Sequence, residues 1–401
     1  MIRIALTALV LSVSVAAVAQ DTCQFMMYNL LQFPNEKPNR IGYLKEIVKD
    51  VEPDVFMVCE LSNNAGSVTI LTQALNTDGV SHFQRASFWD DGTLNNMLYY
   101  NTKKYKLSFQ DTIACEPRFA TVYQLLYRPA LLEGDSIRSN FIVVHLKAGS
   151  SDADERTQAA KKIRRYIDQE LKGENVFLAG DFNIYSPTEG AFQTFTQKGD
   201  FPLVDPIDQI GEWSNDDYYA RVHTQSTRTT SFGGGSTGGM DDRFDWILMS
   251  EDVETGDNKV EYVFGSYKAF GNDGQHFNTA INIGTNKVVS EDIADALHEM
   301  SDHLPVIMQV SYSFTSGLQE QAETSPYQVI VQQNIKVRSH LGNDLTSISL
   351  CDASGKVVFQ QSATGVSNLE IPRPQLQGIY LLRIETSKGF VARKLILPAQ
   401  P

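Results

Sequence analysis

The chain has 401 residues, of which 42% are hydrophobic and 10% aromatic, so it can build a sizeable core and is neither disordered over most of its length nor collagen-like. At about 150 residues per domain, this length predicts two or three domains. Lys and Arg number 34 against 48 Asp and Glu, a net charge of −14. This acidity disfavours a protein that holds nucleic acid by neutralising many phosphates, whereas an enzyme that binds nucleic acid transiently remains compatible with it.

The first 19 residues have the pattern of a secretory signal peptide. Arg3 gives a positive start, residues 4–18 are largely apolar, and Ala17 and Ala19 form a small-residue cleavage signal, which predicts cleavage after Ala19. The apolar run is short for a membrane anchor, and no later segment reaches the ~18 apolar residues of a spanning helix. We therefore expect an exported, soluble monomer with no stable membrane insertion.

Four cysteines remain in the exported chain: Cys23, Cys59, Cys115 and Cys351. Export permits disulfides, and three full pairings are open. Cys59 lies inside an apolar run, which favours a small buried residue there. Because no CxxC pair is present, a zinc or redox site is not expected.

Between residues 25 and 312, short apolar runs end in polar residues, as is typical of strands covered on both faces. Apolar residues at helical spacing predict one amphipathic helix at about 41–48 and another over 154–171, which ends near Gly173. Strands that alternate with helices indicate a layered α/β domain. The apolar runs are 25–29, 55–60, 141–145, 176–181, 244–249 and 304–308.

The pattern changes after a stretch rich in Ser, Glu, Gln and Thr at 316–327, which indicates a linker. Beyond it, short strands at 348–350, 357–359, 378–384 and 391–397 predict a small all-β unit. Residues 321–401 hold eight Lys and Arg and five Asp and Glu, so the acidity of the chain belongs to the preceding part. The predicted domains are a signal peptide at 1–19, a catalytic domain at 20–312, a linker at 313–326 and a β-sandwich at 327–401.

Polar side chains end four of the predicted strands: Asn29, Glu60, His145 and Asp181. The ends of buried strands are where α/β sheets place their sites. A single ending of this kind is more often a strand that meets solvent. Four of them together indicate a functional site.

Two motifs and one carboxylate extend this set. In Gly180-Asp181-Phe182-Asn183, residues i and i+2 of an extended segment face the same way, so Asp181 and Asn183 can address one ligand. The alternative is an Asx turn that closes the strand. In Ser301-Asp302-His303, the side chains of Asp302 and His303 can reach one pocket only if the backbone turns there. The alternative is a solvated strand entry.

Asp245 precedes the apolar residues 246–248, an unusual place for a carboxylate. A buried carboxylate needs a partner, and a histidine is a good candidate because the pair raises the basicity of the imidazole. A structural salt bridge or a strand-edge cap is the alternative.

The order of these residues resembles the DNase-I-like endonuclease/exonuclease/phosphatase superfamily over about residues 25–312. The motifs GDFN and SDH, about 120 residues apart, carry most of this similarity. The resemblance implies a four-layer α/β sandwich, in which two mixed β-sheets lie face to face with helices outside. It also implies hydrolysis of phosphate esters with Mg²⁺, for which Mn²⁺ or Ca²⁺ are the alternatives.

The resemblance also implies roles by position. Glu60 is similar to the main metal carboxylate of the family, Asp302 to a second acidic group at the metal, and Asn29 lies close by. Carboxylate and amide oxygens suit Mg²⁺.

The resemblance also implies, by position, which residues take part in catalysis. His303 is similar to the base that activates water, and Asp245 to the carboxylate that orients it. Asp181 and Asn183 are similar to the pair that aligns the nucleophile and holds the phosphate, and His145 to a phosphate-contacting histidine.

These features predict a secreted, metal-dependent phosphodiesterase with nucleic acid as the leading substrate. A sphingomyelinase-like lipid phosphodiesterase and a phosphomonoesterase are the rivals. Residues 61–64 lack the basic element of several nuclease branches, and the register of Arg118 against a nuclease phosphate contact is open. A non-catalytic surface-binding protein on the same fold is the hypothesis from another class.

The last ~75 residues resemble the C-terminal sorting domains of the type IX secretion system. The stretches that carry this similarity are 352–358, 378–384 and 394–397. The resemblance implies that the secretion machinery is a partner and that the protein is secreted or held at the cell surface. An ordinary β-sandwich accessory module is the alternative.

Overall fold

The computed structural model describes residues 18–315 apart from 38, 93, 133 and 232, and residues 327–397 apart from 332–333, 340–341, 343, 353–355, 376–377 and 387–388. One compact unit spans Val18–Thr315, and a second contains the described residues from Tyr327 onward. Of the predicted signal peptide only Val18 and Ala19 are described, and of the predicted linker only 313–315.

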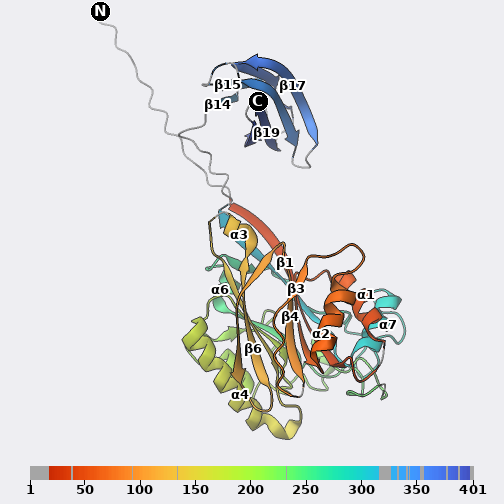
Figure 1. Ribbon diagram of the computed structural model, residues 1–401. Helices are drawn as coiled ribbons and strands as arrows, with labels where there is room; N and C mark the ends of the chain where they lie inside the picture. Colours follow the sequence, from red (N-terminus) through yellow and green to blue (C-terminus); the bar gives the residue numbers. More distant parts are fainter. Residues whose placement is uncertain are drawn as a thin grey trace, which may run out of the picture. The chain divides into compact units, whose positions relative to one another are not determined.

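Two mixed sheets form the larger unit (Figure 1). In the first, β1 runs parallel to β2, and in the second β7 runs parallel to β8, while the other neighbouring strands are antiparallel. The first sheet contains, in spatial order, β11 (Val260–Tyr262), β13 (Val306–Thr315), β1 (Val18–Phe33), β2 (Val55–Leu61), β4 (Asn95–Asn101) and β3 (Phe83–Arg85), with β12 (Lys268–Ala269) paired to β13. The second contains β5 (Tyr105–Ala114), β6 (Phe119–Tyr127), β7 (Arg138–His145), β8 (Val176–Asp181), β10 (Asp245–Ser250) and β9 (Leu203–Val204).

Helices cover the outer faces of both sheets (Figure 1). The first sheet carries α1 (Ile41–Val51), α2 (Asn64–Ile70), the π-helical η1 (Leu71–Leu75) and α7 (Glu291–Met300), and the second carries α4 (Ala153–Tyr166) and α5 (Gly190–Thr196). Shorter helices are α3 (Arg128–Leu132), η2 (Ser150–Asp152), η3 (Ile167–Leu171), η4 (Asp217–Val222) and α6 (Glu251–Thr255). This is the four-layer α/β sandwich predicted from the sequence.

The two long predicted helices are confirmed. In α1 the buried residues are Leu44, Ile47, Val48 and Val51, which recur at helical spacing along one face. The predicted helix at 154–171 is α4 followed by the π-helical turn η3. It ends at Lys172, whose left-handed φ of 51° closes the helix one residue before Gly173.

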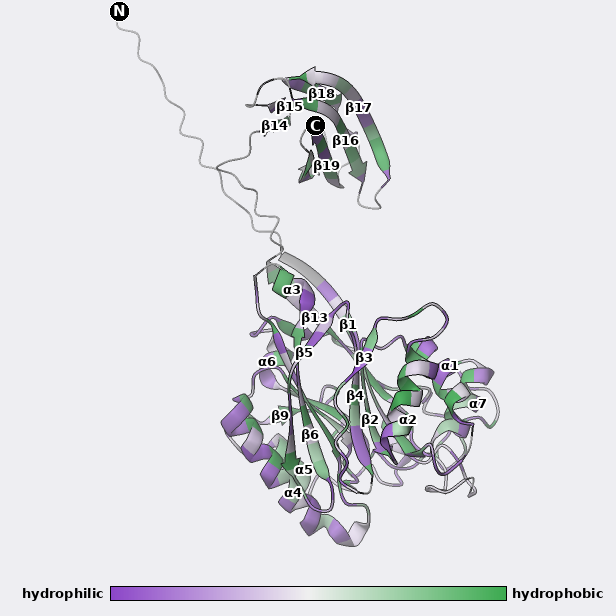
Figure 2. Cartoon of the chain, in the orientation of Figure 1, coloured by the Kyte–Doolittle hydropathy of each residue, from purple (hydrophilic) through white to green (hydrophobic). Residues whose placement is uncertain are grey.

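The central strands are largely apolar because each faces a core on both sides. Phe25 of β1 packs edge-on against Phe141 of β7 and Phe177 of β8, with ring centroids 5.0 Å apart in each case. The alternate residues Ile142 and Leu178 pack instead against the helices of the outer layer. Figure 2 shows the same division, with hydrophobic residues on the strands and hydrophilic ones on the outside of α4.

The C-terminal unit is all-β, as predicted. Its two antiparallel sheets enclose a separate core that includes Ile335, Val337, Leu350 and Leu382. One sheet contains β14 (Tyr327–Val331), β15 (Asn334–Ser339) and β18 (Asn368–Pro372), and the other β17 (Val357–Val366), β16 (Leu345–Asp352), β19 (Gly378–Thr386) and β20 (Gly389–Leu397).

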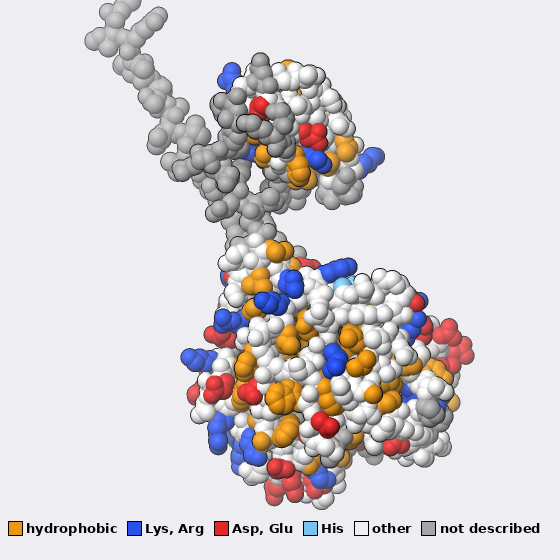
Figure 3. All heavy atoms as spheres, in the orientation of Figure 1, with side chains coloured by type: hydrophobic (Ala, Val, Ile, Leu, Met, Phe, Trp, Pro, Cys, Tyr) orange, Lys and Arg blue, Asp and Glu red, His pale blue; other side chains and the backbone are white. Residues whose placement is uncertain are grey.

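All four cysteines are free thiols, and Cys59 is fully buried, as predicted. Within the described ranges, we find no helix with the length and apolar character needed to cross a bilayer. On the face of the larger unit seen in Figure 3, acidic, basic and apolar side chains are interspersed.

Gly180 of β8 leaves no room for a side chain beside the neighbouring strand β7. A Cβ at Gly180 would lie 1.9 Å from the carbonyl oxygen of Val144. Because the obstacle is backbone, Gly180→Ala should destabilise the larger unit by about 3 kcal/mol. Gly42→Ala is the matched control: no atom lies within 4 Å of its Cβ, and it should be neutral or stabilising because it removes a helical glycine.

Thermal unfolding followed by tryptophan fluorescence measures this difference. All three tryptophans lie between residues 89 and 246, so the signal reports only the larger unit. A Gly180→Ala chain that unfolds at the wild-type temperature would contradict the prediction.

Candidate active site

A buried histidine and carboxylate form the centre of the site. Asp245 is the first residue of β10 and His303 lies three residues before β13, and His303 Nδ1 is 2.7 Å from Asp245 Oδ2. Both side chains are almost fully buried. When the imidazole is neutral, an Nδ1–H that donates to Asp245 leaves Nε2 as an acceptor.

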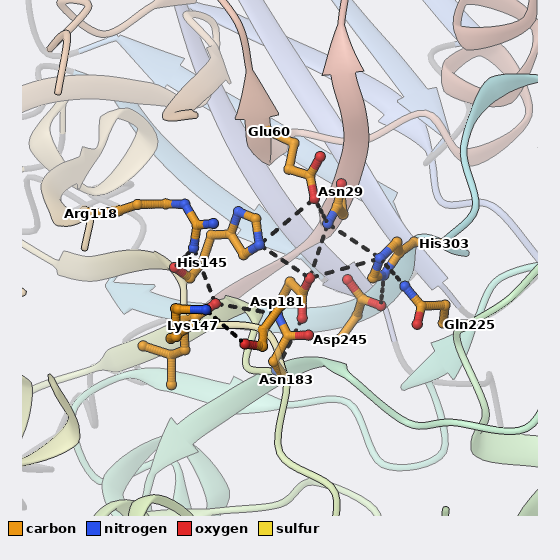
Figure 4. A network of polar contacts seen from close by, with 12 residues as sticks. Asn29, Glu60, Arg118, His145, Lys147, Asp181, Asn183, Gln225, Asp245 and His303 are labelled. Carbon is orange, nitrogen blue, oxygen red and sulfur yellow. Dashed lines mark hydrogen bonds and ion pairs between the residues drawn. The ribbon is translucent and has the colours of Figure 1, made fainter. Parts of the chain in front are cut away.

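Two side-chain amides face that acceptor. Gln225 Nε2 lies 2.6 Å and Asn29 Nδ2 3.3 Å from His303 Nε2 (Figure 4). Burial lowers the pKa of His303, but the negative charges of Asp245, Asp302 and Asp181 outweigh it and hold the pKa well above its usual value. These carboxylates therefore favour the protonated form of the imidazole.

Three potential metal ligands lie next to this pair. Oε1 of Glu60, Nε2 of His145 and Oδ2 of Asp181 all lie within 4.8 Å of one another. His145 Nε2 is 3.7 Å from Glu60 and 3.6 Å from Asp181, and Asn29 Nδ2 donates to Glu60 Oε1 at 2.9 Å and to Asp181 Oδ2 at 3.0 Å. Figure 4 shows the four side chains directed toward one another from both sheets.

The register of the strands explains this convergence. Asn29 is paired with Cys59, the residue before Glu60, across the parallel strands of the first sheet. Asp181 is paired with both His145 and Asp245 in the second sheet. Glu60 has a left-handed φ of 57°, which interrupts the regular strand at the point where its side chain meets the second sheet.

The charges of this group fit a divalent cation. Burial raises the pKa of Glu60, as does the charge of Asp302, and burial also raises the pKa of Asp181 against the lowering effect of His303. Burial, together with Arg118 and His303, holds the pKa of His145 well below its usual value, which leaves a neutral imidazole that can ligate a metal. A cation among these groups would compensate the crowded negative charges.

Asp302 lies at the edge of this group. Its Oδ2 accepts a hydrogen bond of 2.6 Å from the Ser236 amide, and its buried Oδ1 has no hydrogen-bond partner within the described ranges. A Cβ on Gly235 would lie 2.7 Å from the same carboxylate. The glycine-rich segment 233–239 therefore contacts the site directly, and its lack of side chains at this point permits the contact.

The backbone after Asp181 differs from the extended geometry expected from the sequence. Asn183 has a left-handed φ of 49°, and its N–H donates to Asp181 Oδ1 at 3.0 Å. This is the Asx turn considered as the alternative. The Asn183 side-chain amide donates to the carbonyl of Leu146 at 3.3 Å, so the turn, and not strand alternation, sets its direction.

Three polar residues at the site were not assigned a role from the sequence. Gln225 contacts His303 from an irregular segment that has no periodic signal. Arg118 Nη1 donates to the carbonyls of His145 and Leu146 at 3.0 and 3.2 Å. Arg40 is 1% exposed and donates to the carbonyls of Leu30, Leu31 and Met300.

Arg40 ties the two halves of the site together. Its acceptors lie directly after Asn29 and directly before Ser301, and Ser301 Oγ itself donates to the carbonyl of Asn29 at 2.7 Å. A buried guanidinium needs several acceptors, and this one finds them in the two segments that carry Asn29 and His303.

Comparison with known families decides the identity of this unit. The model of the endonuclease/exonuclease/phosphatase family matches residues 26–303. The chain belongs to this family. The model of the secretion system C-terminal sorting domain matches residues 330–398, which identifies the small all-β unit. No curated protein matches the chain.

Several solved structures are similar to this family member. The human Nocturnin catalytic domain with bound sulfate shows 13% identity, 74% coverage of this chain and 97% of its own, and a TM-score of 0.48. Zebrafish (D. rerio) TDP2 complexed with single-strand DNA product shows 15% identity, coverage of 72% and 98%, and a TM-score of 0.48. An endonuclease/exonuclease/phosphatase family protein from Bacteroides thetaiotaomicron shows 14% identity, coverage of 73% and 99%, and a TM-score of 0.49.

The charge of Glu60 generates a prediction about metal binding. In Glu60→Gln the shape is kept and the charge is lost, so added Mg²⁺ or Mn²⁺ should raise the unfolding temperature less than it does in the wild type. Without metal the variant should be at least as stable as the wild type, because a crowded buried carboxylate is removed. Glu46→Gln, on the exposed side of α1, is the control, and an identical metal response in the Glu60 and Glu46 variants would contradict the assignment.

Proposed function

We propose that this protein is a secreted, divalent-cation-dependent phosphodiesterase that hydrolyses nucleic acid, DNA or RNA. The observation that carries the proposal is the His303–Asp245 pair, 2.7 Å apart, directly beside the group of Glu60, His145 and Asp181. A base next to a cation-binding group is what metal-assisted attack of water on a phosphate ester requires. The family assignment supports the same chemistry.

The residues of the chain divide the work as follows. His303 Nε2 accepts the proton of the attacking water, and Asp245 holds the imidazole in the tautomer in which Nε2 is the acceptor and stabilises its protonated form. The Gln225 and Asn29 amides position the imidazole. Mg²⁺, when bound, supplies a positive charge that polarises the phosphoryl oxygen.

Two sets of residues are candidates to hold the cation. The family resemblance selects Glu60, Asp302 and Asn29, with His145 at the phosphate and Asp181 and Asn183 at the nucleophile. The structure offers His145 and Asp181 beside Glu60 as the other set, with ligand atoms within 4.8 Å of one another. The Asn29 Oδ1 atom of the first set already accepts the Leu31 N–H, and its Nδ2 faces the carboxylates. Glu60 is common to both sets and is the primary ligand of the proposal.

An assay panel tests the substrate. The wild-type chain is offered plasmid DNA, RNA, sphingomyelin, a phosphomonoester and a bis-aryl phosphate, each with Mg²⁺, with Ca²⁺ and with EDTA. Cleavage of DNA or RNA that EDTA abolishes supports the proposal. Cleavage of sphingomyelin or the monoester alone would replace the substrate, and no hydrolysis of any substrate would favour a binding protein on this fold.

The proposed role of His303 as the general base can be tested by substitution. His303→Ala should lower turnover of the preferred diester by on the order of 10²–10⁴ in a folded protein. Asp245→Asn should lower it as well, because the amide cannot stabilise the protonated imidazole. His82→Ala, directly before β3 and outside the contacts of this site, is the control. Wild-type turnover in folded His303→Ala would remove this residue from the mechanism.

We also propose that the chain is exported in two steps. In this proposal residues 1–19 are a signal peptide, 20–312 the catalytic domain, 313–326 a linker and 327–401 a sorting domain that the type IX secretion machinery binds. The sorting-domain match over 330–398 and the separate core of this unit support it. The protein would then be secreted or held at the cell surface.

Truncation tests the division of labour between the two units. Because each unit has its own core, a chain that ends at Thr315 should fold and keep the specific activity of the full chain. In a host with a type IX system it should fail to reach the outer surface. A folded but inactive truncated chain would show that the C-terminal unit takes part in the site.

A further inference from the structure

Two exposed aromatic side chains lie at the same end of the sheets as the candidate active site. Trp89 is 43% exposed and Phe119 is 37% exposed. The other two tryptophans, Trp213 and Trp246, are buried. Large exposed aromatic rings beside a catalytic centre are candidates for substrate contacts.

Hydrogen bonds place Trp89 near the catalytic group. Trp89 lies in the segment that leads into β4, and the Asp91 N–H of this segment donates to Asn95 Oδ1 at 2.9 Å. Asn95 in turn donates to the carbonyl of Leu61 at 3.1 Å, and Leu61 directly follows Glu60. The tryptophan is therefore carried on the loop that borders the Glu60 end of β2.

Phe119 joins this loop from the second sheet. Its N–H donates to Asp91 Oδ2 at 3.3 Å, and its carbonyl accepts from Asn96 Nδ2 at 3.0 Å. The antiparallel pairing of β6 with β7, which matches Thr121 with Val143, places Phe119 level with His145. The two aromatic residues thus share one border of the site.

Arg118 connects this border with the catalytic group. One of its terminal nitrogens is fixed by the carbonyls of His145 and Leu146, and within the described ranges its Nε and Nη2 groups have no hydrogen-bond partner. A guanidinium with free N–H groups binds a phosphate, and an adjacent aromatic ring binds the base attached to it. Arg118 and Phe119 are neighbours in the chain, so a cationic side chain and an aromatic side chain lie on consecutive residues of this border.

We propose that Trp89 and Phe119 form a stacking platform for unpaired nucleobases, so that the protein prefers single-stranded over double-stranded nucleic acid. The proposal rests on the proposed function, since it names the form of the same substrate. Stacking on a side chain needs a base with a free face, which a duplex does not offer.

The charges beside Trp89 favour a base over a lipid chain. Asp90 and Asp91 follow the tryptophan directly, and Asp90 is exposed. Insertion of Trp89 into a bilayer would carry these carboxylates toward the hydrocarbon, at a high cost in free energy. A nucleobase covers only the ring and leaves the carboxylates in water.

The exposed tryptophan supplies its own probe. The full chain with His303→Ala, which should consume substrate on the order of 10²–10⁴ times more slowly than the wild type, is titrated with a dodecamer of deoxythymidine and Mg²⁺ while tryptophan fluorescence is followed. Because Trp213 and Trp246 are buried, we expect quenching that arises from Trp89. Trp89→Ala should abolish the quenching and raise the Kd by about tenfold.

A strand of the same length without bases is the decisive control. This strand keeps the phosphates and has no base to stack. Chains with and without Trp89→Ala should therefore bind it with the same Kd, and neither should show quenching. Phe119→Ala should weaken binding of the dodecamer in the same direction as Trp89→Ala. Phe264→Ala, which removes a 94% exposed ring at the opposite edge of the first sheet, should leave the Kd unchanged.

The outcomes separate this inference from the proposed function. Hydrolysis of a phosphodiester by the wild type, without quenching by the dodecamer, overturns the platform and leaves the function standing. Quenching by the dodecamer without hydrolysis of any phosphodiester supports the platform and overturns the function. A blue shift with vesicles of phosphatidylcholine and sphingomyelin, but no response to the dodecamer, overturns the platform in favour of a lipid surface.

Discussion

The central constraint on this structure is that three buried carboxylates are crowded around the imidazole of His303. Asp181, Asp245 and Asp302 are each at least 95% buried, and all three raise the pKa of His303. Such an arrangement is costly unless every charge finds a partner. His303 and the amides of Asn29 and Gln225 supply part of the compensation, and a divalent cation would supply the rest. The crowded charges of the site therefore lower the stability of the fold, and the same charges give the site its reactivity.

The rest of the larger unit holds these charges in place. Phe25, Phe141 and Phe177 fix the distance between the sheets by edge-on contacts at 5.0 Å. Arg40 links the segment after Asn29 to the end of α7 through three carbonyls. Rigid packing behind the candidate site leaves its polar side chains few alternative positions, which is what preorganisation requires.

The segments that border the site are built differently. The glycine-rich segment at 233–239 touches Asp302 with backbone atoms, and the loop that carries Trp89 is tied to the sheets through Asp91 and Asn95. Substrate selection in a family with a shared centre falls to such borders, because the core leaves little room for variation.

The sequence by itself determined the layers, because hydrophobic periodicity is a local property that follows from burial on one face or two. The GDFN and SDH motifs are also recognised from the sequence alone. So is the apolar setting of Asp245, which requires a partner for its carboxylate. The family resemblance implied that this partner is His303, and the structure shows the contact across 58 residues of chain. Only the tertiary structure showed that His145 faces Glu60 and Asp181 and that Gln225 contacts His303. The turn at Asn183 likewise appeared only there. These contacts depend on strand register and on the closure of long loops, and neither leaves a trace in the spacing of neighbouring residues.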